Sequence, residues 1–190
     1  MGKKIKMKKK IFITGSSGFI GFHLSRSLLS KGARVHGFDS MDNYYDVRLK
    51  KSRLKILKKY KNFTFTKNNL VNFKNLSNSM IKFKPNYIIH LGAQAGVRYS
   101  LDVPRKYIST NITGTFNVIE LANKLKVKHL LIASSSSVYG SNKQKKFKEN
   151  DKTDTQLSVY AATKKSTESI AHSYSSLWNI PITLLRFFTV

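Results

Sequence analysis

Short apolar runs alternate with longer amphipathic stretches along this chain. The apolar runs, rich in β-branched residues, predict strands at Lys10–Thr14, Arg34–Phe38, Phe63–Lys67, Tyr87–Leu91, His129–Ser134 and Ile182–Phe187. The amphipathic stretches between them predict helices at Phe19–Ser30, Asp46–Tyr60, Phe73–Phe83, Pro104–Leu125 and Ser158–Trp178. Central strands such as Leu130–Ala133 are almost wholly apolar, which indicates burial on both faces.

Strands that alternate with helices of this length indicate βαβ units. The predicted fold class is therefore α/β, with a Rossmann-type, doubly wound parallel sheet and helices on both faces. We expect residues 1–9 to form a basic leader and residues 10–190 to form one domain, because the chain is long enough for one sizeable core.

Composition limits the class of protein. The first ten residues hold six lysines and precede an apolar stretch, as in a secretion signal, but glycines interrupt that stretch and favour a strand that runs into a loop. The absence of cysteine excludes disulfides, zinc-thiolate sites and a thiol nucleophile, and it fits the cytoplasm. No apolar run approaches the ~18 residues of a membrane span.

The charge is the most unusual feature of the composition. Thirty-five Lys and Arg against nine Asp and Glu give a formal net charge of +26, which often accompanies nucleic-acid binding. Most of these cations are lysines on ordinary helix faces, and only Arg48–Lys61 forms a dense run. Specific readout tends to use arginine forks and stacked aromatics. We interpret the excess as a solvated face, and a basic RNA-binding protein stays an alternative.

Three glycines, Gly15, Gly18 and Gly21, follow the first predicted strand and open the first predicted helix. Such glycines allow a tight turn and let the backbone approach a pyrophosphate at the helix N-terminus. The spacing is GxxGxxG, not the usual GxGxxG, and alone it also suits a plain turn. Asp39 ends the second predicted strand, where an acid can bind the adenosine ribose and repel a 2′-phosphate. Together these residues predict NAD, favoured over NADP.

Tyr160 and Lys164 lie four residues apart at the start of a predicted helix, so they share one face. A phenol has a pKa near ~10, and we expect the ammonium of Lys164 to lower the pKa of Tyr160 towards neutral pH. The preceding strand runs into Ser134–Ser137, at the sheet edge where ligands bind. A serine there can position a sugar hydroxyl against Tyr160, and a serine-rich turn is the alternative.

In this order, the glycine loop, Asp39, Ser135, Tyr160 and Lys164 resemble the glycine loop, ribose acid and Ser-Tyr-Lys triad of extended short-chain dehydrogenases, in the NAD-dependent epimerase/dehydratase family. Longer strings are similar to those of UDP-glucuronate 4-epimerases. These strings are Asp39–Lys50, Ala93–Ser100, Ala133–Gly140, Tyr160–Lys165 and Leu185–Val190.

The resemblance implies roles for individual residues, with no metal site. The catalytic residues would be Ser135, Tyr160 and Lys164. The residues implied to bind or support NAD are Gly15, Ser17, Gly18, Phe19, Ile20, Gly21, Asp39, Asn69, Leu70, Leu91, Gly92, Ala93, Gln94, Asn111, Tyr160 and Lys164. Asn111 would support the triad through its helix. The residues implied to lie near the sugar are Arg98, Ser100, Ser136, Ser137 and Thr189.

The resemblance also implies a reaction, the conversion of UDP-glucuronate to UDP-galacturonate through a transient 4-keto sugar. Tyr160 would take the proton of the 4-hydroxyl while NAD takes a hydride from C4 and returns it to the other face. Two departures from the family stand out. Asn69 replaces a usual Asp, and the chain stops at Val190, where the family continues into a second domain that grips the UDP. We therefore expect a truncated form that lacks its C-terminal substrate domain.

Several alternatives remain open. A UDP-glucose 4-epimerase differs only by a carboxylate on the sugar. A nucleotide-sugar 4,6-dehydratase needs an acid and a base, which those families carry as Asp-Glu where this chain has Ser136 and Ser137. The non-enzymatic alternatives are an NAD-binding sensor and the RNA-binding protein. As partners we expect a UDP-sugar, no membrane, no specific nucleic acid, and a homodimer as the assembly to test.

Overall fold

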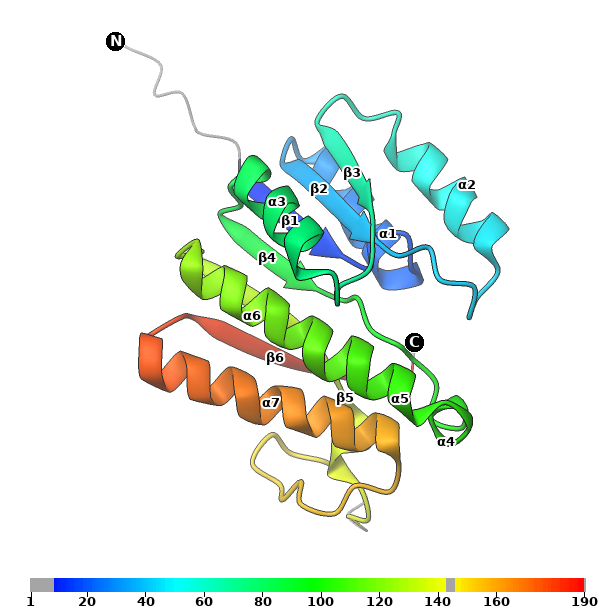
Figure 1. Cartoon of the computed structure of the whole chain (residues 1–190), viewed down its shortest axis with the longest axis vertical. Coiled ribbons are helices and arrows are strands. Elements are labelled where there is room, and N and C mark those ends of the chain that lie inside the picture. Colours follow the sequence, from blue (N-terminus) through cyan, green and yellow to red (C-terminus); the bar gives the residue numbers. More distant parts are fainter. Residues whose placement is uncertain (1–8, 143–145, 190) are drawn as a thin grey trace.

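The computed structural model describes residues 9–142 and 146–189. Six strands form one parallel sheet in the order β3-β2-β1-β4-β5-β6 (Figure 1). Their bounds are β1 Lys10–Thr14, β2 Arg34–Asp39, β3 Phe63–Lys67, β4 Tyr87–His90, β5 His129–Ser135 and β6 Ile182–Phe187. The strand order reverses between β1 and β4, and open α/β sheets bind ligands at such a switch point. The predicted fold is confirmed, whereas the predicted basic leader lies, except for Lys9, outside the described residues.

Helices cover both faces of the sheet. Their bounds are α1 Phe19–Ser30, α2 Val47–Leu57, α3 Phe73–Phe83, α4 Tyr99–Asp102, α5 Pro104–Tyr107, α6 Gly114–Lys124 and α7 Val159–Trp178. α1 and α2 pack around Ile13 and Val35, while α3, α6 and α7 pack on the opposite face around Phe12 and Ile88. The central strands are thus buried on both sides, as their apolar sequences require. Within the described ranges, no helix is long and apolar enough to cross a membrane.

One predicted helix has a different internal structure. The stretch predicted as a single helix from Pro104 to Leu125 consists of α5, a π-helical segment at Ile108–Thr113, and α6, which follow one another in Figure 1. Segments of π-helix are rare and concentrate at functional sites. The helix α4 and a 3₁₀ turn at Ser136–Tyr139 were not predicted, because four residues are too few to display a helical period.

The long helices differ in how they begin. The side chains of Asp46, Asn72 and Ser158 accept hydrogen bonds from backbone N–H groups at the starts of α2, α3 and α7. These bonds satisfy donors that a helix leaves unpaired. α1 begins at Phe19 after the N-cap residue Gly18, and no side chain of the described residues caps it. The first N–H groups of α1 therefore remain directed towards the carboxyl edge of the sheet, where they can serve an anion.

Candidate active site

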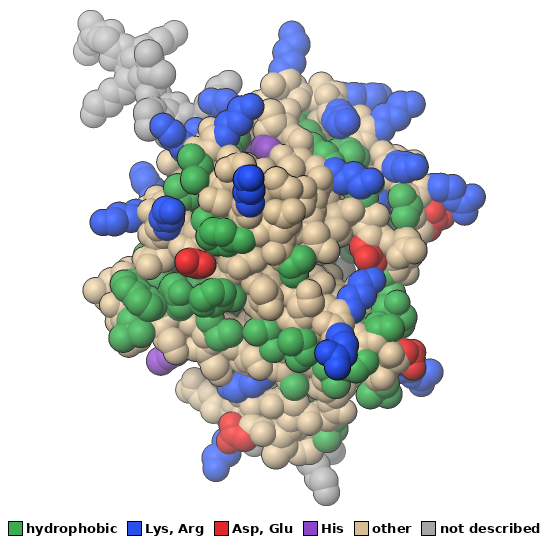
Figure 2. Space-filling model, viewed as in Figure 1, with side chains coloured by type: hydrophobic (Ala, Val, Ile, Leu, Met, Phe, Trp, Pro, Cys, Tyr) green, Lys and Arg blue, Asp and Glu red, His purple; other side chains and the backbone are tan. Residues whose placement is uncertain are grey.

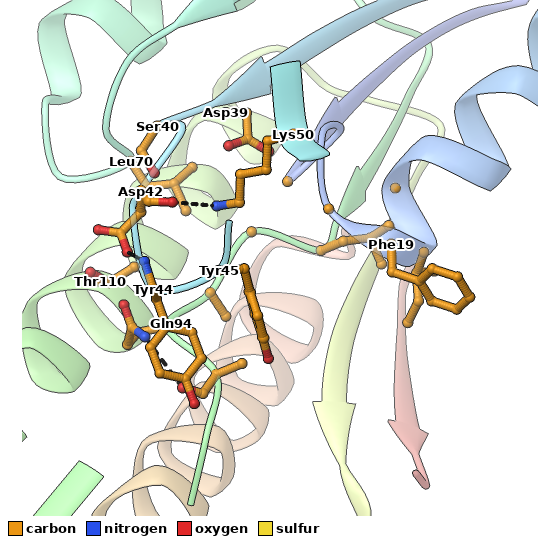
Figure 3. A pocket seen from close by; sticks show the side chains of 18 of the residues that line it. Phe19, Asp39, Ser40, Asp42, Tyr44, Tyr45, Lys50, Leu70, Gln94 and Thr110 are labelled. Carbon is orange, nitrogen blue, oxygen red and sulfur yellow. Dashed lines mark hydrogen bonds between the residues drawn. The ribbon is translucent and has the colours of Figure 1, made fainter. Parts of the chain in front are cut away.

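A pocket of about 600 Å³ lies at the carboxyl edge of the sheet (Figure 3), a size typical of cofactor sites. Its walls are the glycine loop, the end of β2, the loop after β4, and the segment that connects β2 to α2. Twelve of the residues implied to bind NAD line it: Gly15, Gly18, Phe19, Ile20, Gly21, Asp39, Asn69, Leu70, Leu91, Gly92, Ala93 and Gln94. The structure thus brings together residues from four separate stretches of sequence.

The glycine loop has no room for side chains at two positions. A Cβ on Gly21 would lie 2.1 Å from the carbonyl oxygen of Gly15, and a Cβ on Gly15, whose φ is +69°, would lie 2.8 Å from the Gly92 nitrogen. The loop is tied to β2, because Ser17 N donates to Asp39 Oδ2 at 2.9 Å. Ser17 Oγ is fully buried and lacks a hydrogen-bond partner within the described residues, so the loop holds an orphaned polar atom close to a predicted ligand.

Asn111, in the π-helical segment, joins the pocket wall to α7. Its Oδ1 accepts from Gln94 N at 2.7 Å, and its Nδ2 donates to Thr163 Oγ1 at 3.1 Å. Thr163 Oγ1 in turn donates to the carbonyl oxygen of Tyr160 at 2.8 Å. Asn111 is 1% exposed, so this buried chain of hydrogen bonds is shielded from water. It holds the first turn of α7 at a set position relative to the pocket.

Ser135, Tyr160 and Lys164 meet at the carboxyl end of β5. A hydrogen bond joins the side chains of Ser135 and Tyr160. Lys164 Nζ donates to the carbonyl oxygen of Ala133 at 2.8 Å, and Ala133 itself lines the pocket. The predicted catalytic residues therefore lie together where β5 reaches the pocket.

The electrostatics of this group differ from the expectation. Burial raises the pKa of Tyr160 above its usual value, and the hydrogen bond with Ser135 acts in the opposite direction. Burial also lowers the pKa of Lys164 to about 8, because a buried ammonium loses its hydration. The predicted lowering of the Tyr160 pKa by Lys164 is therefore wrong for the protein by itself, since loss of hydration dominates the titration of both groups.

The five residues implied to lie near the sugar are scattered. Ser136 and Ser137 form the start of the 3₁₀ turn that follows β5. Ser100 is fully buried, and its hydroxyl donates to a backbone carbonyl at 2.5 Å. Arg98 and Thr189 are exposed and do not line the pocket. The structure therefore brings only the two serines beside the catalytic group.

Sequence reasoning did not assign one wall of the pocket. The side chains of Asp42, Tyr44, Tyr45, Lys50 and Lys106 line it. Lys50 is only 9% exposed, and its Nζ donates to the carbonyl oxygen of Asp42 at 2.9 Å. The string Asp39–Lys50 carried part of the resemblance, but its spacing gave no sign of which side chains face a ligand.

A buried ion pair beneath the catalytic group was also missed. Glu168 in α7 accepts from Ser134 Oγ at 2.5 Å and from Arg186 Nε and Nη2 of β6 at 3.0 and 2.9 Å. Glu168 is 4% exposed, and loss of one partner of a buried pair costs about 3–5 kcal/mol. The available signal was its position four residues after Lys164, on the same helix face.

Known proteins are similar to this chain in sequence and in architecture. The family model described as GDP-mannose 4,6 dehydratase matches residues 12–190. Protein CapI of Staphylococcus aureus is 51% identical over 181 residues, which are 95% of this chain and 54% of that protein. A probable UDP-glucuronate 4-epimerase of Rhizobium meliloti (strain 1021) is 46% identical over 95% of this chain and 53% of its own length.

A solved structure is also similar. UDP-glucuronic acid 4-epimerase from Bacillus cereus, in complex with UDP-glucuronic acid and NAD, matches with a TM-score of 0.88 and 33% identity, over 95% of this chain and 56% of its own. The present chain therefore spans about half the length of the relatives that it matches.

Proposed function

Because this chain belongs to the NAD-dependent epimerase/dehydratase family, we propose that it supplies the NAD-binding and catalytic part of a UDP-sugar 4-epimerase. The observation that carries the proposal is that one sheet edge holds both a pocket suited to a dinucleotide and the Ser135–Tyr160–Lys164 group, joined through Ala133. The proposed reaction converts UDP-glucuronate to UDP-galacturonate. The names of the Rhizobium meliloti and Bacillus cereus relatives support that substrate.

The residues of the pocket fit NAD chemically. The carboxylate of Asp39 has further lone pairs that can accept hydrogen bonds from the hydroxyls of the adenosine ribose. Its negative charge disfavours a 2′-phosphate, so NAD is preferred over NADP. The start of α1 and the crowded glycine loop suit the pyrophosphate, and in the same loop Ser17 Oγ has no hydrogen-bond partner among the residues that the structure describes. Lys164 would hold the nicotinamide ribose. NAD, when bound, accepts a hydride from the sugar and returns it.

Within this proposal, Tyr160 removes the proton of the sugar 4-hydroxyl and later restores it. Burial raises the pKa of Tyr160, so the phenolate needs a compensating positive charge. We assign this role to Lys164, which lies four residues further along the same face of α7. Ser135 holds the reacting hydroxyl, and Asn111 keeps the first turn of α7 in position through Thr163.

The competing functions have less support. A UDP-glucose 4-epimerase remains the alternative, because it needs the same residues up to the sugar carboxylate. For a 4,6-dehydratase, Ser136 and Ser137 lack the acid and base of an elimination. Tyr160 and Lys164 argue against a sensor without catalysis. Figure 2 shows Lys and Arg side chains over much of one face, closest together near α2, with other residues between many of them; we keep the proposal of a solvated face, and an RNA site stays the alternative.

Location and assembly are also part of the proposal. We place the protein in the cytoplasm, where nucleotide sugars and NAD are available and a chain without cysteine is unremarkable. We propose a homodimer formed by the apolar band over α6 and α7 (Figure 2), which includes Phe116, Leu177 and Trp178 at 38%, 69% and 51% exposure. Sedimentation of native and Trp178→Lys proteins tests this, and a native monomer at every concentration would refute it.

The reaction is tested by incubating the protein with NAD and either UDP-glucuronate or UDP-glucose and resolving the products by chromatography. Because the chain spans about half of its relatives, a fusion to the C-terminal half of the Rhizobium meliloti relative is assayed in parallel. We expect UDP-galacturonate from UDP-glucuronate and little turnover of UDP-glucose. A preference for UDP-glucose supports the alternative epimerase, and a 4-keto-6-deoxy product the dehydratase.

A further inference from the structure

The segment Ser40–Asp46, here named the strap, connects β2 to α2 and forms the wall of the pocket that faces the glycine loop (Figure 3). It is held at Asp42 by two lysines. Asp42 Oδ2 forms an ion pair with Lys106 Nζ of α5 at 3.0 Å, and Lys50 Nζ of α2 donates to Asp42 O at 2.9 Å. The strap is therefore a structured wall and not a loose connection.

Tyr44 of the strap fits a notch that exists because residue 96 is glycine. Gly96 has a φ of +98°, and a Cβ there would lie 2.0 Å from Tyr44 Oη. The fully buried Tyr107 fixes the floor of the notch, since its hydroxyl donates to the carbonyl oxygens of Ala95 and Gly96 at 2.6 and 2.7 Å. The Tyr44 ring also stacks on Tyr99, with centroids 4.9 Å apart.

We propose that Tyr44 and Gly96 form a latch that closes the strap over a bound dinucleotide and sets the rate at which it dissociates. The inference rests on the proposed function, which places a dinucleotide in this pocket. A dinucleotide on the glycine loop lies between that loop and the strap, because both line the same pocket. The strap can swing away only when Tyr44 leaves its notch, so opening the latch gates release.

A latch of this kind suits a reaction that uses the same dinucleotide twice. The proposed epimerisation withdraws a hydride and then returns it. Release of the dinucleotide between the two transfers would leave the 4-keto sugar without its hydride donor. Tyr107 also packs edge-on against Tyr160, with centroids 6.2 Å apart. The residue that shapes the notch thus contacts the proposed acid/base, and the closed strap and the positioned Tyr160 share one support.

The test compares two glycine-to-alanine substitutions at positive φ. Gly96→Ala forces Tyr44 out of the notch. Gly32→Ala is the matched control, because Gly32 has a φ of +83° and no atom of the described part of the chain lies within 4 Å of its Cβ position. It therefore adds similar backbone strain, in the turn after α1. Tyr44→Ala empties the notch from the other side, and the double variant of Gly96 and Tyr44 tests whether the two act as one unit.

The first measurement uses no dinucleotide. Chymotrypsin cleavage after Tyr44 and Tyr45, followed by mass spectrometry, should be about tenfold faster in Gly96→Ala than in Gly32→Ala, because the lost ring contacts favour the open strap. The second measurement is stopped-flow displacement of fluorescent etheno-NAD by NAD. Its dissociation rate should rise about tenfold in Gly96→Ala and Tyr44→Ala, with an association rate within about threefold of the native value.

The results distinguish a latch that gates release from a Tyr44 that only packs against its neighbours. They also distinguish failure of the latch from failure of the proposed function. In the double variant, dissociation should be no faster than in either single variant. Equal dissociation rates in Gly96→Ala and Gly32→Ala overturn the latch. Faster chymotrypsin cleavage of the strap with an unchanged dissociation rate of etheno-NAD also overturns the latch, because Tyr44 then acts only in packing. If the native chain shows no saturable NAD binding, the proposed function fails and the latch with it, and the native protein alone reveals that outcome.

Discussion

The glycine loop after β1 and the serine, tyrosine and lysine group around β5 and α7 lie along the same sheet edge, but they are built differently. The first consists of backbone and missing side chains, since Gly21 has no room for a Cβ beside Gly15. The second consists of side chains whose pKa values burial has moved, as in Tyr160 and Lys164. Substitutions should therefore damage the fold at the first and the chemistry at the second.

The largest effect is expected at Tyr160. Tyr160→Phe removes only the hydroxyl and should lower turnover of UDP-glucuronate by about 10²–10⁴-fold, the usual contribution of a general acid–base group. The free energy of unfolding and the NAD affinity should stay nearly unchanged. The fusion that carries a relative's C-terminal half is the protein to assay. Near-native turnover by the Phe variant would remove Tyr160 from the mechanism and weaken the epimerase proposal.

At the glycine loop, Gly21→Ala should lower the free energy of unfolding by about 3 kcal/mol, the upper part of the range for overpacking. The clashing atoms belong to the backbone of Gly15 and Ser16 and cannot rotate away. Gly18→Ala is the control, because its Cβ would lie 3.2 Å from the nearest atom, and we expect a loss below about 1 kcal/mol. Urea unfolding followed by circular dichroism measures both, and equal losses would contradict the steric account.

Between the two regions, His90 gives the fold a sensitivity to acid. Its nitrogens bond to Thr14 Oγ1 at 2.7 Å and Thr115 Oγ1 at 2.9 Å, and burial, with the charge of Lys164, lowers its pKa from 6.5 to about 3. The folded state therefore favours neutral histidine, so stability is complete above pH 6.5 and falls as the pH drops towards 3.

At pH 5 this single group should reduce the free energy of unfolding by about 2 kcal/mol. Urea unfolding at pH 7.5 and pH 5.0 measures the loss. His36, whose pKa burial lowers to about 4, should add a comparable loss, so His90→Gln should remove about half of the pH dependence. An unchanged dependence in that variant would show that His90 does not titrate as proposed.

The smallest effect has the opposite sign. The pKa of Lys164 falls from 10.5 to about 8, which corresponds to about 3 kcal/mol of unfavourable burial below pH 8. Lys164→Met removes the cost of burying the ammonium and also the hydrogen bond to Ala133. We therefore expect a net gain of about 1 kcal/mol in the free energy of unfolding at pH 7, together with loss of turnover. The gain should vanish as the pH rises towards 10.5. Destabilisation at pH 7 would mean that the ammonium is well accommodated.

The difference between the regions also explains what the sequence could reveal. The strands were predictable because burial on both faces demands nearly continuous apolar runs, as in Leu130–Ala133. The glycine loop and Asp39 were predictable because their chemistry depends on spacing along the chain. The notch for Tyr44 depends on a backbone dihedral 52 residues away at Gly96, and no local pattern records such a contact.

Electrostatics were the least predictable part of the site. The spacing of Tyr160 and Lys164 correctly placed both on one helix face, but the direction of the Tyr160 pKa depends on burial, which spacing does not report. Glu168 and Arg186 likewise form a pair only because β5, β6 and α7 pack together. Sequence can therefore propose the members of such a site more readily than their charge states.

The π-helical segment at Ile108–Thr113 changes the direction in which side chains point along a long helical stretch. Each residue of an α-helix advances the side-chain direction by about 100°, and a π turn inserts one residue more than an α turn. The two halves of the stretch are therefore out of phase. Lys106 in the first half lines the pocket, as does Thr110 in the π-helical segment itself, while the second half buries Val118 and Leu121 in the core. Deletion of one residue from the segment would bring the halves into phase, and pocket and core would then compete for the same face.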